Sequence, residues 1–264
     1  MGKYFYSFFL SLEQYTHNRL EFFLGRLRNI IVLILLYYVW IGVSSATGKF
    51  SSFTTNELVT YVLLANILRS FIFGAQSRRI AIEINDGIFS VYLVRPVNHF
   101  ILFYFRELAE RSALLVSALI EVTIFAAILH IHILFPQHII QWIRFLLSVF
   151  LAHILYYIMS YAINLIAFWS REAMGPRFLF EWFLEFASGA YFPLNVLRPI
   201  YFFFLGALPF IGMIFVPLMI YLEKIKYSDI PTYIGLQAWW ILVSGLITFI
   251  LWKKGLKRYS GEGI

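Results

Sequence analysis

The chain has 264 residues, of which 61% are hydrophobic, 20% aromatic and only 13% charged, whereas about 25% of the residues of a soluble domain are charged. A soluble fold of this length could not bury so much apolar surface, so we predict an integral membrane protein. Cysteine is absent, which excludes a disulfide framework, a thiolate metal site and a cysteine nucleophile.

The net charge of +7 would suggest a nucleic-acid partner in a soluble protein. In a membrane protein the positions of the basic residues matter more than their sum, because short cytoplasmic loops are enriched in Lys and Arg. We therefore predict contact with the lipid bilayer and no nucleic-acid partner.

The N-terminal segment, residues 3–26, places aromatic residues and leucines at steps of three and four among charged residues. This pattern predicts an amphipathic helix in the membrane interface, with its apolar face in the acyl boundary. The first long apolar run begins near Ile30 and has no small-residue cleavage pattern, which argues against a cleaved signal peptide.

Six apolar segments are suitable membrane spans, because a spanning helix needs about 20 mostly apolar residues. They are residues 28–46, 57–75, 112–135, 139–169, 178–195 and 235–252. The sequence therefore predicts an all-α, polytopic fold in which one membrane domain uses the whole chain.

A seventh apolar segment, residues 199–222, is long enough to span but is interrupted by helix-weakening residues. These are Pro199, Gly206, Pro209, Gly212 and Pro217. We predict a re-entrant helical hairpin on the extracytoplasmic side, between the fifth and sixth spans.

The distribution of Lys and Arg supports six spans with both termini in the cytoplasm. In that topology the outer segments hold only Lys49, Arg198, Lys224 and Lys226. Seven spans would instead place the basic C-terminal sequence KKGLKR, residues 253–258, outside.

The longest hydrophilic connection, residues 76–111, lies on the cytoplasmic side in this topology. Its residues Ile80, Ile84, Ile88 and Val91 recur at helical spacing. We predict a short amphipathic helix over residues 78–93, which ends before Arg95-Pro96 because a residue that precedes proline disfavours the helical conformation.

Glu121 and His153 fall near the middle of the third and fourth predicted spans. Ionisable residues are costly there and often mark a functional site. Two interpretations remain open: a proton relay or substrate site, or a hydrogen-bonded carboxyl group and a packed neutral imidazole. Arg69 and Arg144 lie near span ends, from which their side chains reach water.

Glu181 and Glu185 are four residues apart and share one face of the fifth predicted span. They either line a vestibule that opens to the cytoplasm or pair with Arg171 and Arg177. The residues that we predict along a translocation path are Glu121, His153, Glu181 and Glu185.

The sequence has neither the phosphate-binding loop GxxxxGK[ST] nor the dinucleotide motif GxGxxG, and no catalytic constellation. We predict that the chain is not an enzyme, so that any ATP hydrolysis occurs on another subunit. His130, His132 and His138 lack carboxylate or cysteine companions at ligand spacing. We interpret them as interfacial residues and predict no metal or cofactor in this chain.

The order of the segments resembles the permease subunit of type-2 ATP-binding-cassette (ABC-2) exporters, and in particular a bacterial branch of similar length. The inner connection carries the pattern R…I…G…L-x-R-P of that branch. The matching residues are Arg79, Ile82, Gly87, Leu93, Arg95 and Pro96, followed later by Phe192-Pro193-Leu194, Trp240, Trp252 and the tail Gly255 to Tyr259.

The resemblance implies a half-transporter in a bacterial cytoplasmic (inner) membrane that dimerises with itself or with a similar permease. By this resemblance it would bind two separate ATPase subunits, which would hold ATP and Mg. Residues 78–93 would be the coupling helix that contacts the ATPase, and a helix on the membrane surface is the alternative. The coupling residues would be Arg78, Arg79, Glu83, Asp86, Gly87 and Arg95.

By the same resemblance, the first, second and fifth spans line the path and residues 199–222 gate it. The abundance of aromatic residues favours an amphipathic or hydrophobic cargo such as a lipid, lipopeptide or drug. The alternative function is an ion-coupled carrier or channel that uses Glu121, His153 and Arg144. A membrane component without transport activity is a third class.

Overall fold

The computed structural model describes residues 2–17, 19–45, 49–74, 78–170 and 174–259. Its α-helices are α1 (Gly2–His17), α2 (Arg19–Ser45), α3 (Thr55–Ile72), α4 (Arg78–Asn85), α5 (Ser90–Val94), α6 (His99–Ile128), α7 (Ile139–Asn164), α8 (Met174–Ala187), α9 (Pro199–Gly206), α10 (Phe215–Tyr221) and α11 (Ile230–Arg258). The short 3-10 helices are η1 (Leu165–Phe168), η2 (Leu194–Val196) and η3 (Pro209–Gly212). Strands β1 (Lys49–Phe50) and β2 (Phe53–Thr54) form a small antiparallel hairpin. The predicted all-α class is confirmed.

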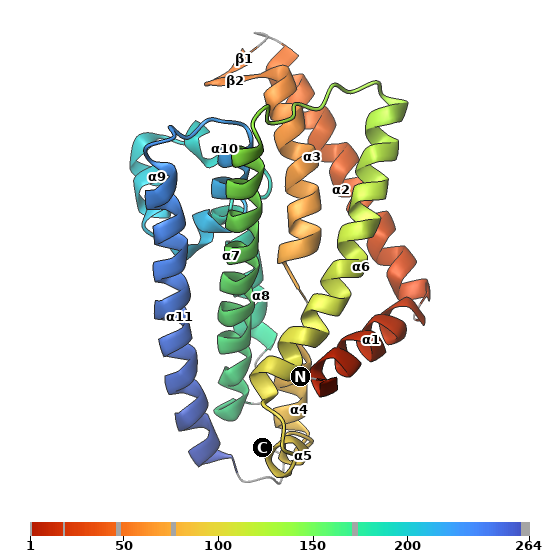
Figure 1. Cartoon of the computed structure of the whole chain (residues 1–264), viewed down its shortest axis with the longest axis vertical. Helices are drawn as coiled ribbons and strands as arrows, with labels where there is room; N and C mark the ends of the chain where they lie inside the picture. The colour runs from red at the N-terminus through yellow and green to blue at the C-terminus, as the bar shows by residue number, and fades with distance from the viewer. Residues whose placement is uncertain (1, 18, 46–48, 75–77, 171–173, 260–264) are drawn as a thin grey trace.

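The long helices α2, α3, α6, α7 and α11 run along the length of the molecule (Figure 1). The β hairpin, α9 and α10 lie at one end, and α4 and α5 lie at the other. Both terminal segments reach the α4–α5 end, since the Tyr4 hydroxyl accepts a hydrogen bond from the Asn98 N–H (3.1 Å) and the Tyr259 hydroxyl donates to the Gly87 carbonyl (2.9 Å).

Among the described residues, four helices are long and apolar enough to cross a membrane: Phe22–Ser44, His99–Ile128, Ile139–Phe168 and Ile230–Arg258. The pair Pro199–Gly206 and Pro209–Tyr221 is bent by 81° and forms either a broken span or a re-entrant loop, as its prolines predict. Counted as one span, the pair brings the total to five, so the predicted count of six remains a prediction.

The two remaining predicted spans are weaker candidates in the structure. Helix α8 has 14 residues, which extend roughly 21 Å against a hydrocarbon core of about 30 Å. Helix α3 has 18 residues and includes the polar Asn56, Glu57, Asn66 and Arg69. It nevertheless runs beside α2 and α6 for most of its length (Figure 1).

The N-terminal and third predicted helices have different limits in the structure. The interfacial helix predicted over 3–26 ends at His17, and residues 19–26 belong to α2. Helix α6 begins at His99, well before the predicted span 112–135, because the Asn98 side chain caps it by accepting the Ile101 N–H (3.1 Å). It ends at Ile128, before His130 adopts a positive φ of 51°.

The continuous helix predicted over residues 78–93 is wrong. The segment forms two helices, α4 and α5, joined by a turn at Gly87, whose φ of 75° is left-handed and breaks the helix. The predicted fifth span, 178–195, likewise ends at Ala187, before Gly189 with a φ of 83°. Ala46 and Ala75, where two predicted spans end, and Arg171 lie outside the described residues.

Helix packing depends on buried polar contacts as well as on apolar side chains. The Gln237 side chain of α11 donates to the Gly212 carbonyl (2.6 Å) and accepts from the Ser148 hydroxyl of α7 (3.0 Å). Between membrane helices such bonds contribute roughly 0.6–2 kcal/mol each. They fix α11 against α7 and the bent pair at the α9–α10 end.

Candidate functional site

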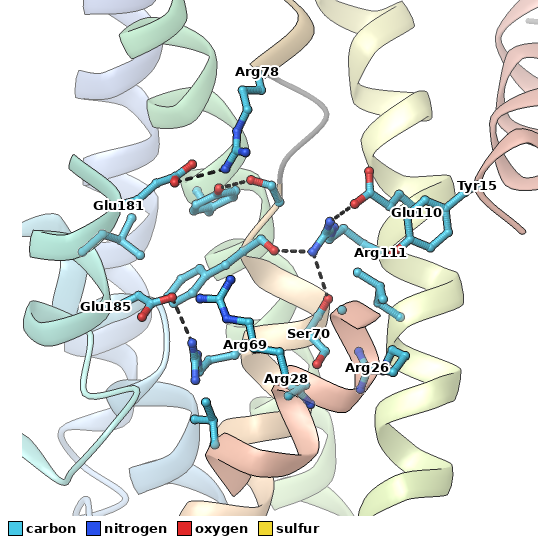
Figure 2. Close-up of a pocket in the computed structure, with 18 residues that line it drawn as sticks. Tyr15, Arg26, Arg28, Arg69, Ser70, Arg78, Glu110, Arg111, Glu181 and Glu185 are labelled. Carbon is cyan, nitrogen blue, oxygen red and sulfur yellow. Dashed lines mark hydrogen bonds and ion pairs between the residues drawn. The ribbon is translucent and has the colours of Figure 1, made fainter. Parts of the chain in front are cut away.

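A charged cavity of about 420 Å³ lies between α2, α3, α6 and α8, towards the α4–α5 end (Figure 2). Its charged lining residues are Arg26, Arg28, Arg69, Arg78, Glu110, Arg111, Glu181 and Glu185. Its position is set by Phe73 and Gly74, which follow the C-terminal end of α3, and by Arg78 at the start of α4. The cavity therefore lies where the bundle of long helices meets the α4–α5 connection.

Glu121, predicted along the path, is held in an ion pair with Arg26 that joins α6 to α2. Both side chains are nearly buried, with exposed fractions of 12% and 10%. The Arg26 guanidinium donates to both carboxylate oxygens, and the Asn29 amide adds a bond of 3.3 Å. Because its charge is matched by Arg26, Glu121 is a helix-pairing residue directly behind the cavity wall.

Glu181 and Glu185 both line the charged cavity and pair with arginines, of which Arg177 is a predicted partner; an opening of the cavity to the cytoplasm remains a prediction. Glu181 binds Arg177 at 2.7 Å and Arg78 at 3.5 Å. Glu185 binds Arg69 at 2.9 Å and accepts a hydrogen bond from the Tyr191 hydroxyl. The Arg78 contact links α4 to α8, and the Arg69 contact links α3 to α8.

Arg111 was not predicted as part of the site, although it is a buried centre of it. It pairs with Glu107 and Glu110 on its own helix and donates to the backbone carbonyls of Ser70 and Phe73. The spacing of Glu107 and Arg111, four residues apart, is a signal for a shared helix face. The contacts to α3 have no such signal, because they join residues far apart in the sequence.

The charged cluster consists of the charged cavity residues and their ion-pair partners. It has one more arginine than glutamate: Arg26, Arg28, Arg69, Arg78, Arg111 and Arg177 against Glu107, Glu110, Glu121, Glu181 and Glu185.

Two arginines of this cluster retain unused donor capacity. Arg28 is exposed and has no ion-pair partner among the described side chains. Nη1 of Arg69 is buried without a hydrogen-bond partner in the described part of the chain. Because Arg28 is exposed and lines the cavity, its guanidinium can donate to an additional hydrogen-bond acceptor there, whereas Nη1 of Arg69 is closed off by burial.

The α4–α5 segment, residues 78–95, has a buried side and an exposed side. Ile80, Ala81, Ile84 and Phe89 are buried against η1 at the end of α7 and against Trp252 of α11. The Tyr259 hydroxyl also accepts a hydrogen bond from the Ser90 N–H (3.1 Å) and so holds the turn at Gly87. The α4–α5 segment is therefore held in place against the ends of α7 and α11.

The exposed side of this segment is an apolar face. It consists of Ile82, Ile88, Val91, Leu93 and Val94, and Val94 is 84% exposed. The predicted coupling residues Arg78, Arg79, Asp86 and Arg95 are also exposed.

Glu83 instead faces the protein, where it accepts from the Tyr92 hydroxyl (3.3 Å) and lies 4.0 Å from Arg106. Burial raises the pKa of the Glu83 carboxyl, although the Arg106 charge and the Tyr92 hydrogen bond oppose the shift. Glu83 therefore joins α4 to α5 through Tyr92, and its role in coupling remains a prediction.

A family model described as ABC-2 family transporter protein matches residues 29–263. The chain belongs to this family. It is the membrane-spanning permease of an ABC transporter, a multi-pass and non-catalytic subunit, as the sequence predicted. No curated protein and no solved structure matches the chain.

Membrane subunits of ABC transporters usually pair with ATPase subunits, and the permease itself typically has no cofactor. Within the described residues, no three His, Cys, Asp or Glu side chains form a group that could hold a metal ion. His130, His132 and His138 are exposed in the connection between α6 and α7. In this ABC-2 permease the site is thus built from arginines and carboxylates.

The three residues predicted for an ion-coupled carrier have different surroundings in the permease. Glu121 pairs with Arg26, and the Arg144 guanidinium lies over the Tyr227 ring, 5.4 Å from its centroid. His153 is 1% exposed and stacks on Phe71 at 4.8 Å, outside the lining of the charged cavity. Over the described residues, the structure does not bring these three side chains together.

Proposed function

We propose that this permease belongs to an ATP-driven exporter that moves an amphipathic or hydrophobic cargo out of the cytoplasm or the inner leaflet. Two separate ATPase subunits bind ATP and Mg, and a second permease copy or a similar permease completes the path. The chain has six spans in a bacterial cytoplasmic membrane, with both termini and the α4–α5 segment in the cytoplasm.

The exposed apolar face of the α4–α5 segment is the observation that best supports ATPase docking. Ile88, Leu93 and Val94 are exposed, and the α4–α5 segment that carries them lies at the end of the molecule that Tyr4 and Tyr259 reach (Figure 1). Buried apolar contacts with charged residues around them are typical of a specific protein interface, and Arg79, Asp86 and Arg95 surround this face. The face fits a cleft on a soluble subunit.

Two contacts would transmit a movement of α4 to the helices that line the translocation path. The buried side of α4 packs on η1, which continues α7, and Arg78 pairs with Glu181 of α8. Glu185, one turn further along α8, pairs with Arg69 of α3. A shift of α4 upon ATP binding therefore changes the spacing of α3 and α8 around the charged cavity.

The cavity and the surface of α8 together suit an amphipathic cargo. Glu181 and Glu185 face the cavity, whereas Phe178, Trp182 and Phe186 of the same helix are exposed. Charged groups therefore lie beside a large aromatic surface that a cargo chain or the second permease copy can cover. We place the translocation path along α2, α3 and α8.

The docking proposal is tested by purifying the tagged permease from its host and identifying the bound ATPase by its GxxxxGK[ST] loop. Val94→Asp places a charge on the docking face and is expected to reduce the ATPase recovered by tenfold or more. Val94→Thr has nearly the same shape without the charge and is the matched control. Equal ATPase recovery with both variants would argue decisively against docking through this face.

A further inference from the structure

We infer that the charged cavity binds the phosphodiester group of an anionic lipid, and that this group is the polar end of the cargo. The inference rests on the proposed transport function and specifies its substrate class. It follows from the charge of the cluster, its unused hydrogen-bond donors and its position along α2 and α3.

The charge of the site favours a single negative charge. The charged cluster defined above has one more arginine than glutamate, and the five glutamates are already in ion pairs. A phosphodiester carries one negative charge, so it would neutralise the cluster. A ligand with several carboxylates would leave excess negative charge in this partly buried site, and a cationic ligand would leave excess positive charge. Uncompensated charge in such a site is costly.

The donors of the site match phosphate oxygens. Nη1 of Arg69 is buried without a partner, and the exposed Arg28 lines the same cavity. Arginine presents a planar set of donors that binds phosphate oxygens in pairs. A phosphate bound by Arg28 would thus use donors that the protein leaves unpaired, whereas the buried Nη1 of Arg69 would reach the phosphate only if the Arg69 side chain moved.

The position of the cavity suits a headgroup with its acyl chains still in the bilayer. Gly74 and Arg78 place one side of the cavity at the junction with the α4–α5 connection. On α2, Leu24, Leu27 and Ile31 are exposed around Arg28. An acyl chain can therefore lie on this apolar surface of α2 while the headgroup enters the cavity.

The cavity volume is consistent with this ligand class. About 420 Å³ falls in the range of roughly 300–1,000 Å³ that is usual for small-molecule sites. It accommodates a glycerophosphate group, whereas the acyl chains remain outside. The quaternary ammonium of phosphatidylcholine would meet the arginines and reduce the affinity of that lipid.

The test is the thermal unfolding of the purified permease–ATPase complex in detergent with one of three additions: phosphatidylglycerol, phosphatidylcholine or inorganic phosphate. A ligand that binds only the folded protein raises its melting temperature. We expect stabilisation by phosphatidylglycerol at concentrations at least tenfold below those needed for phosphatidylcholine. Stabilisation by inorganic phosphate at similar concentrations would assign the site to a free anion with the same chemistry.

Arg28→Gln is the decisive variant, because Arg28 has no described ion pair whose loss would unfold the protein. It is expected to weaken the effect of phosphatidylglycerol by at least tenfold, and Arg28→Lys is expected to restore part of it. Arg258→Gln removes an exposed arginine from the end of α11 and serves as the matched control. An equal response of Arg28→Gln and Arg258→Gln, or no response to any addition, would overturn the inference.

The same lipid titration on the permease purified alone, next to that on the complex, separates this inference from the proposed function. A complex that retains its ATPase but shows no preference for an anionic lipid contradicts the inference alone. A permease that shows the lipid preference but never binds an ATPase contradicts the proposed function and leaves the lipid site standing.

Discussion

Individual charged residues in this permease are accommodated by pairing between helices. Arg26 of α2 and Glu121 of α6 are 95 positions apart in the sequence and form one such pair. Each charge would be costly within a membrane if it were isolated. The ion pair compensates both charges, and the Asn29 amide adds a hydrogen bond to Glu121.

Arg26→Met is expected to lower the free energy of unfolding by about 3–5 kcal/mol, because it leaves the Glu121 carboxylate buried without its counter-charge. The double variant Arg26→Met/Glu121→Met removes both charges and is expected to recover most of the loss. Denaturant unfolding in detergent measures both. A double variant as unstable as the single one would show that the pair does not explain the burial of Glu121.

Gly255 of α11 allows close approach of the α11 backbone to η1. A Cβ at this position would lie 2.2 Å from Cδ2 and 2.7 Å from Cγ of the fully buried Phe168. Gly255→Ala is therefore expected to destabilise the protein by about 1–3 kcal/mol.

Gly245 provides a matched control on the same helix, because no atom lies within 4 Å of a Cβ added there. Gly245→Ala is expected to be neutral or stabilising by up to about 1 kcal/mol, since alanine favours the helix. Thermal unfolding compares the two variants. Equal melting temperatures would contradict the packing described for Gly255.

Among the elements, those with local signals could be predicted from the sequence. The prolines at 199, 209 and 217 predict the broken hairpin, and the structure bends there by 81°. Thr54 and Glu57 form a capping box at the start of α3, in agreement with a helix that begins near residue 57. These features depend on residues within a few positions of each other.

The ends of some helices could not be predicted from the sequence, because they depend on the backbone conformation of a single residue. Helical spacing continues from Ile80 through Ile84 and Ile88 to Val91, yet Gly87 turns the chain and divides the helix. The charged cavity is a further case, because Arg69 and Glu185 meet only when α3 and α8 pack. Apolar composition predicts the approximate position of a span, but it does not predict which charged side chains on different helices form pairs.

The crossing of α8 can be tested by single cysteines, because the natural chain has none. Gly175 at the start of α8 and Arg198 after it are both exposed. With six spans, a membrane-impermeant maleimide is expected to label Arg198→Cys in intact cells and Gly175→Cys only after permeabilisation. Labelling of both from the same side would show that α8 does not cross.

At the scale of the whole molecule, contacts connect the α4–α5 segment with the charged cavity. The α4–α5 segment is held by α7 and α11, and Arg78 connects it to α8 beside the cavity. The chain is the membrane subunit of an ABC transporter, and such subunits usually pair with ATPase subunits, so in the proposed function the force enters through a protein contact. The exposed face around Val94 is where we propose that it enters.

The most direct test of this account is a photocrosslink from the docking face. The photoreactive residue p-benzoylphenylalanine replaces Val94, and as a control it replaces Ile139, which is 75% exposed at the start of α7. We predict a crosslink from position 94 to a subunit that contains the GxxxxGK[ST] loop, and none to that subunit from position 139. No crosslink from position 94 in a complex that contains the ATPase would contradict the account.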